Sequence, residues 1–249
     1  MEISVFISLI ISVFIGVVVP ILIFIGLLVM KKIKILQVIK GALVSIVVNM
    51  LFLRLILTAI MDVLNVTSLY DIRMFIAIGI YSLIALGIHY YVFKKILNIE
   101  EKPQYQYQIT LGYGSVYVFS FMRNAFTNLI IGDHLRVNDI EYLSYMGIDN
   151  VDQMISLFHT EHIGYFLSVG LQSIIVILLH ILIVYFLSRA MKNKSIKDFI
   201  LCFVVLLGLY MMMYMSTLLP SFILMLFSLI ICIYTSYYIY KNISLNIVH

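Results

Sequence analysis

Two arginines, Arg54 and Arg123, lie inside long apolar stretches of the chain. A charged side chain at membrane depth costs roughly 3 kcal/mol or more, so such residues usually have a function. None of the twelve acidic residues lies within the same stretches, which leaves neither arginine a carboxylate at its own depth. A guanidinium suits bidentate binding of phosphate or carboxylate. The pair therefore predicts either side chains that reach up to the lipid head groups, or a site for an anionic ligand or an acidic residue of a partner protein.

Other polar side chains accompany these arginines. Ser120, Arg123, Asn124, Thr127 and Asn128 recur at spacings of three and four, which places them on one face of a helix. Counted from the expected outer ends of their helices, both arginines lie roughly 11 Å deep, so that they could share one site. The candidates for binding a ligand or partner are Arg54, Arg123, Asn124, Thr127, Asn128, Asn49 and Gln172.

Two histidines, His89 and His180, lie in the inner halves of their apolar stretches. Two imidazoles at comparable depth could bind a metal, but a catalytic zinc usually has three protein ligands, and the sequence offers no third at that level. We therefore favour histidines that are hydrogen-bonded within a helix bundle and expect no cofactor. The stretches also lack a carboxylate to orient a catalytic base, so no catalytic triad is expected.

A stripe of small and polar residues follows the second apolar stretch. Gln37, Gly41, Ser45 and Asn49 recur every four residues and share one helix face. Small residues let helix backbones approach closely, and polar ones form interhelical hydrogen bonds in membranes. The stripe predicts a tightly packed helix crossing.

The composition is that of an integral membrane protein. The 249 residues are 63% apolar and 11% charged, with a mean hydropathy of +1.12, whereas soluble domains carry about 25% charged residues. A helix needs about 20 apolar residues to cross a bilayer. Seven stretches meet that length, at residues 3–30, 36–61, 74–93, 109–131, 163–187, 199–218 and 221–240. The fold class is therefore all-α, a polytopic membrane bundle of about seven transmembrane helices.

Basic residues predict the orientation of this bundle. The loops after the first, third, fifth and seventh stretches carry eleven lysines and arginines, and the alternate loops only Arg73 and Arg136. Cytoplasmic loops carry the excess of Lys and Arg, which places the N-terminus outside and the C-terminus in the cytoplasm of a cell, bacterial by expectation. Residues 1–249 then form one transmembrane domain. Its outer loop at 132–162 is amphipathic, with apolar residues at helical spacing between 148 and 158.

Short motifs at the ends of three apolar stretches resemble those of a known family. The third stretch ends with Gly87 to Lys95, Gly112-Tyr113-Gly114 opens the fourth, and Glu161-His162 enters the fifth. This layout resembles the YhfC-like family of intramembrane metalloproteases, distant relatives of the CAAX prenyl proteases. The resemblance extends over nearly the whole chain and implies a helical membrane bundle.

The catalytic positions of that family are altered in this chain. Where the family has a Glu-Glu pair, an arginine, a histidine and a later glutamate, the chain has Ala85 and Leu86, His89, Tyr113 and Tyr117. A metal-dependent hydrolase needs both metal ligands and a carboxylate that moves protons. The resemblance therefore implies a degenerate member that has lost catalysis.

The leading prediction is a non-catalytic membrane protein that binds another membrane protein or an anionic lipid or peptide, as a complex subunit or in immunity to a peptide antibiotic. One alternative is a transporter or ABC permease subunit, whose partner would be an ATPase. A second alternative is an active metalloprotease with atypical ligands, among them His89 and His180. Membrane lipids are expected partners, and nucleic acid is not.

Overall fold

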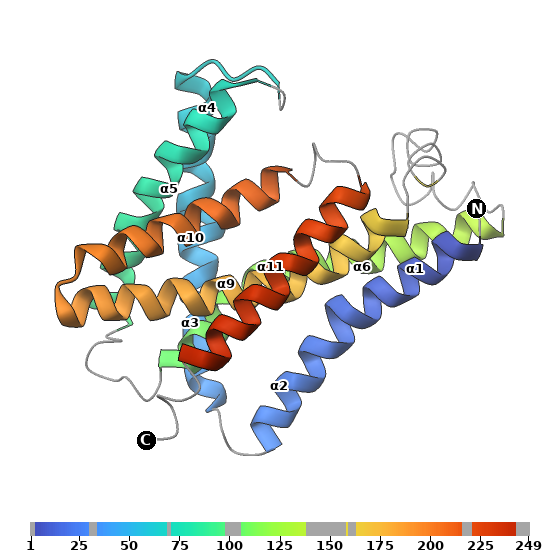
Figure 1. Cartoon of the computed structure of the whole chain (residues 1–249), viewed down its shortest axis with the longest axis horizontal. Helices are drawn as coiled ribbons and strands as arrows, with labels where there is room; N and C mark the ends of the chain where they lie inside the picture. Colours follow the sequence, from blue (N-terminus) through green and yellow to red (C-terminus); the bar gives the residue numbers. More distant parts are fainter. Residues whose placement is uncertain are drawn as a thin grey trace. The chain divides into compact units, whose positions relative to one another are not determined.

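The computed structural model describes residues 3–29, 34–68, 71–97, 106–137, 158, 163–215 and 221–242. Almost all of these residues are helical and none forms a strand, which confirms the all-α class (Figure 1). The helices are α1 (Ile3–Val13), η1 (Phe14–Val18), α2 (Val19–Val29), α3 (Ile35–Ser45), η2 (Ile46–Leu53), α4 (Arg54–Val63), α5 (Arg73–Tyr91), η3 (Val92–Ile96), α6 (Gln106–Arg136), α9 (Ile163–Asn193), α10 (Ile196–Met215) and α11 (Ser221–Asn242).

In every apolar stretch of the sequence, the residues that the structure describes are helical. Within the described part of the chain, five helical segments are long and apolar enough to cross a membrane: Ile3–Gly26, Ile35–Val63, Arg73–Ile96, Ile163–Asn193 and Ile196–Tyr214. The first three contain π-helical turns, at η1, η2 and η3. Helix α11 has a shorter apolar part, Ile223–Ile239, and α6 is long but carries the polar group around Arg123. The chain is thus a multi-pass membrane protein.

The chain forms two compact units. The first comprises Met1–Leu27, Tyr117–Ile175 and Leu219–Ser236, and the second Leu28–Val116, Val176–Leu218 and Tyr237–His249. Their boundaries fall inside α2, α6, α9 and α11, so these helices contribute residues to both units.

The predicted outer loop differs from the structure at its start. Helix α6 continues through Gly132 and ends at Arg136. Most of the predicted amphipathic segment lies outside the described residues. Its Phe158 is described and is buried against Phe166, with ring centroids 5.1 Å apart.

In the first unit, α1 packs against α6 and α9. The buried side chains are Val5, Leu9 and Val13 of α1, Val17 of η1, Ala125, Ile131 and Leu135 of α6, and Phe166 and Val169 of α9, together with Phe158. Glycines bring the backbones together: a Cβ atom on Gly170 would lie 2.6 Å from the carbonyl oxygen of Ser12, and one on Gly16 would lie 3.0 Å from the Cα of Gly170. The contact therefore depends on small residues on both helices.

In the second unit, α5 packs against α10 through pairs of aromatic rings. The ring centroids of Phe75 and Tyr214 are 5.4 Å apart, those of Tyr81 and Tyr210 are 4.6 Å apart, and those of Tyr90 and Phe199 are 5.4 Å apart. Because the residue numbers rise on α5 as they fall on α10, the two helices are antiparallel. Edge-to-face and tilted ring pairs of this kind favour one register.

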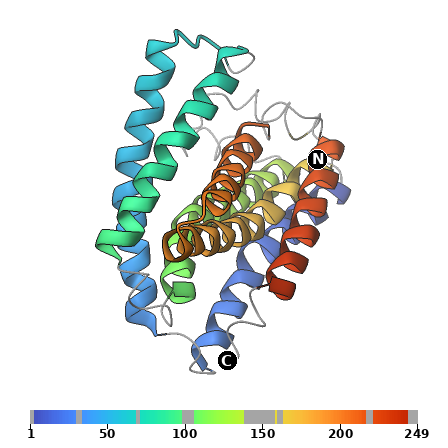
Figure 2. The same ribbon diagram turned by 60° about the vertical axis from the view of Figure 1, so that its left-hand side comes forward.

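Helices α4 and α5 of the same unit also lie side by side, as Figure 2 shows. Their turn is fixed by Arg73, whose Nε donates to Asp71 and whose Nη1 donates to the carbonyl oxygen of Leu64 at 3.1 Å. The hydrogen-bonded guanidinium lowers the pKa of the Asp71 carboxyl to about 2. Asn65, with a φ of 50°, makes the left-handed bend that begins the turn.

A second turn of this unit joins α9 to α10. Lys194 has a φ of 50°, and the amide of Ser195 donates to the carbonyl of Ala190. Arg189 on α9 lies 3.5 Å from the carboxylate of Asp198, of which only 4% is exposed. The ion pair holds the two helices together next to the turn.

The tightest crossing in the second unit joins α3 to α6. A Cβ atom on Gly41 would collide with the carbonyl oxygen of Ile109, and a Cβ atom on Gly112 would collide with the carbonyl oxygen of Val38. Each helix thus presents a glycine to the backbone of the other. The close packing predicted from the stripe of Gln37, Gly41, Ser45 and Asn49 is confirmed.

This crossing gives a stability prediction. Gly41→Ala and Gly112→Ala should each lower stability by about 1–3 kcal/mol, because the added methyl group meets backbone that cannot rotate away. The measurement is the temperature at which buried Cys202 begins to react with a maleimide dye, in a Cys232→Ser background that leaves one thiol.

The matched controls are Gly79→Ala and Gly87→Ala on α5, where a Cβ atom would meet no described atom within 4 Å. Alanine favours a helix over glycine by about 1 kcal/mol, so these variants should be neutral or slightly more stable. An equal loss of stability in all four variants would show that the crossing is not tightly packed.

Candidate functional site

Four polar residues of the second unit form one buried hydrogen-bond network. Ser45 donates from its hydroxyl to the backbone carbonyl of Tyr113 at 2.7 Å, and Asn49 donates from its amide to the Ser45 hydroxyl at 2.8 Å. The Tyr113 hydroxyl lies 3.2 Å from Nε2 of His89 and 3.4 Å from Oδ1 of Asn49. The network therefore joins the α3–η2 segment, α5 and α6 within the bundle.

The proton positions in this network follow from its acceptors. Nδ1 of His89 lies 2.6 Å from the carbonyl oxygen of Ala85, which can only accept, so Nδ1 is assigned the proton. Nε2 of the neutral ring is then an acceptor. The Tyr113 hydroxyl has one hydrogen for two acceptors, His89 Nε2 and Asn49 Oδ1, and the shorter distance favours the imidazole.

A second histidine borders the same tyrosine. The ring centroids of Tyr113 and His180 are 6.1 Å apart, and those of Tyr113 and His89 are 5.4 Å apart. Nδ1 of His180 lies 2.7 Å from the carbonyl oxygen of Val176. Gly114 makes room for this arrangement, since a Cβ atom there would lie 3.2 Å from the Cβ of His180. The prediction of hydrogen-bonded bundle histidines is confirmed for both residues.

The site is enclosed. His89, Tyr113 and Ser45 are fully buried, His180 is 1% exposed and Asn49 is 7% exposed. The described part of the chain contains no group of three His, Cys, Asp or Glu side chains that could hold a metal ion. Without a carboxylate in the network, an imidazole has no group that would stabilise its protonated form during catalysis. The hydrogen bonds of this network can hold the α3–η2 segment, α5 and α6 in a fixed register.

The arginines predicted to form a binding site lie on exposed surfaces. Arg54 is exposed at the start of α4, in the second unit, and Arg123 is exposed on α6, in the first unit. Their sharing of one site stays a prediction. Along the helix axis, Arg54 is about 14 Å from the end of α4 at Val63, and Arg123 is about 20 Å from the end of α6 at Arg136. Both distances exceed the depth expected from the sequence because both helices extend farther than predicted.

The remaining candidates divide between the surface and the interior. Asn124 is exposed, and Thr127 and Asn128 are half-buried, on the part of α6 that belongs to the first unit. Gln172 is buried on α9 of that unit. Asn49 belongs to the buried network of the second unit, and its binding of a ligand or partner stays a prediction.

Tyr113 is the functional-site residue that sequence reasoning did not single out for this role. Gly112-Tyr113-Gly114 has the form of a short glycine motif, but its glycines serve packing, one against α3 and the other against His180. The sequence feature that could have indicated this role is the pair Gly41 and Ser45 on α3, which contacts the Gly112-Tyr113 segment of α6. The spacing of Gly41 and Ser45 does not show which helix they contact, because spacing along the sequence does not determine how a helix is rotated.

Comparison with known proteins found no matching family, no matching curated protein and no matching solved structure. The interpretation of this site consequently depends on its own geometry.

Removal of the Tyr113 hydroxyl tests the network. Tyr113→Phe should lower stability by about 1 kcal/mol, because His89 and Asn49 lose a shared buried hydrogen-bond donor. The Cys202 reactivity assay described above measures the change.

Tyr91→Phe is the control, because Tyr91 is 60% exposed and lies on the same helix as His89. It should change stability by less than about 0.5 kcal/mol. If both phenylalanine variants had the same stability as the wild type, the network would contribute nothing to the fold.

Proposed function

We propose that this chain is a non-catalytic membrane protein that binds another membrane protein through arginine-bearing helix surfaces. The observation that carries the proposal is the exposure of Arg54 within an apolar surface. Its neighbours Leu51, Phe52 and Leu55 are 56%, 59% and 69% exposed, and α4 contains no buried residue. A lipid-facing helix normally presents apolar side chains alone, so the charge marks this surface as a contact.

The partner is recognised by charge. Among the described residues, no carboxylate forms an ion pair with Arg54 or Arg123. A carboxylate on a partner helix would neutralise an arginine at membrane depth and form two hydrogen bonds with its planar guanidinium. Arg123 supports the same interpretation, since the exposed side chains of Phe119, Phe126 and Ile130 surround it on α6.

The absence of catalysis is supported by the buried network. Two of the positions that the YhfC resemblance equates with catalytic residues are His89 and Tyr113, and here they hydrogen-bond to each other. Ala85 is also buried and has no ionisable group. A hydrolytic site needs access for water and substrate, whereas these side chains fill the interior.

The proposal includes the topology predicted from the loops. Seven helices span the membrane, the N-terminus lies outside, and the C-terminus is cytoplasmic in a bacterial plasma membrane. In this orientation α4 and the Asp71–Arg73 turn are on the outer side. A complex subunit, or an immunity protein that meets its target from outside, would use such a surface.

Isolation of the complex tests the proposal. The tagged protein, expressed at its native level and purified in mild detergent, should carry a stoichiometric membrane protein identified by mass spectrometry. Arg54→Met should reduce the bound partner about tenfold or more, as expected for loss of a desolvated charge pair. Arg54→Lys keeps the charge but not the bidentate geometry, so its loss should be smaller.

Leu55→Met is the matched control, because Leu55 is exposed on the same helix and the change is small. It should retain the partner. An unchanged amount of partner in both Arg54→Met and Arg123→Met would contradict the arginine surfaces. Recovery of an ATPase would instead favour a permease subunit, and stoichiometric zinc would favour a protease.

A further inference from the structure

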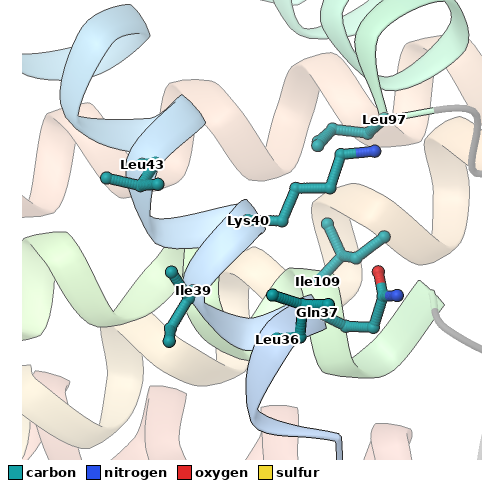
Figure 3. Close-up of a pocket in the computed structure, with 7 residues that line it drawn as sticks. All are labelled: Leu36, Gln37, Ile39, Lys40, Leu43, Leu97 and Ile109. Atoms are coloured by element: carbon teal, nitrogen blue, oxygen red, sulfur yellow. The ribbon is translucent and has the colours of Figure 1, made fainter.

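The second unit contains a pocket of about 350 Å³ beside α3 (Figure 3). Helix α3 provides most of its lining, one residue directly follows η3, and one comes from α6. The lining residues are Leu36, Gln37, Ile39, Lys40, Leu43, Leu97 and Ile109. The volume is within the range of small-molecule sites, which begins near 300 Å³.

The lining combines a hydrocarbon surface with one positive charge. Five of the seven side chains are aliphatic, and the other two are the ammonium of Lys40 and the amide of Gln37. Figure 3 shows the Lys40 side chain extending across the pocket, with its nitrogen on the side of Leu97. None of the seven is acidic, so no lining carboxylate neutralises the ammonium.

The pocket lies at the basic end of its helices. Lys40 is five residues after the start of α3, about 8 Å along the helix, and that start follows Lys31, Lys32 and Lys34 in the sequence. Leu97 follows Lys94 and Lys95 of η3. A lysine stem at this depth keeps its ammonium at the level of lipid phosphates.

We propose that this pocket binds an anionic glycerophospholipid, with the phosphate at Nζ of Lys40 and one acyl chain against the aliphatic lining. Gln37 donates a hydrogen bond to a phosphate or glycerol oxygen from the same side of α3. A lipid fits better than a free anion because most of the lining is hydrocarbon, which a soluble phosphate would leave uncovered. The site is separate from the Arg54 surface and does not depend on the proposed partner.

Selectivity should come from the head group. A lipid chain is as apolar in the bilayer as in the pocket, so seating it there gains packing but little hydrophobic free energy. The charge of Lys40 then decides which lipid stays. A basic residue near an anionic membrane surface contributes about 1 kcal/mol, equivalent to about a fivefold preference.

The experiment uses the full chain in nanodiscs with equal amounts of phosphatidylglycerol and phosphatidylcholine. After release from the nanodisc, native mass spectrometry counts the lipids that remain bound. The wild type should retain phosphatidylglycerol about fivefold over phosphatidylcholine, and Lys40→Met should abolish this preference. Leu43→Trp, which fills the pocket, should remove the retained lipid of either kind.

Lys197→Met is the charge-matched control, because Lys197 is exposed in the first turn of α10 and does not line the pocket. It should keep the wild-type preference. An unchanged preference in Lys40→Met, an equal loss in Lys197→Met, or full retention in Leu43→Trp would each overturn the proposal. Displacement of the lipid by millimolar inorganic phosphate would overturn it too, in favour of a soluble anion. The Cys202 reactivity assay verifies that each variant is folded.

Discussion

The close approach of α3 to α6 is the constraint on which the second unit depends. With glycine at positions 41 and 112, each backbone contacts the other, and Ser45 can reach the carbonyl of Tyr113 across the crossing. The same approach brings Asn49 to the Tyr113 hydroxyl, which meets His89 on α5. One steric condition therefore fixes the register of three segments. In a bilayer, where burial of apolar surface drives little association, such contacts and hydrogen bonds carry the packing.

Polar residues of this chain occur in two contrasting environments. Inside the second unit, Tyr113 hydrogen-bonds to His89, and Asp198 forms an ion pair with Arg189. Arg54 and Lys40, in contrast, are exposed on an apolar surface. The two proposed binding sites accordingly carry an exposed charge, Arg54 on α4 and Lys40 on α3.

The sequence predicted the helices well and their neighbours poorly. Apolar stretches of about 20 residues specify helices almost by length alone, and the four-residue stripe through Gly41 and Ser45 correctly indicated a tight crossing. That the crossing partner is α6, and that Tyr113 meets His89, could not be derived, because spacing along a helix does not give its rotation. Helix ends were also misjudged: polar residues such as Asp133 and His134 continue α6 where the loss of apolarity suggested a loop.

The packing of α1 has a consequence for biosynthesis. Its buried partners are on α6 and α9, between residues 125 and 169, so more than half of the chain must be translated before α1 can complete its contacts. Until then the helix lacks these partners and must stay inserted by its own apolarity. Among the five candidate spans, the one that includes α1 is the most apolar. The first helix is thus apolar enough to remain inserted in the bilayer before the helices that pack against it have been synthesised.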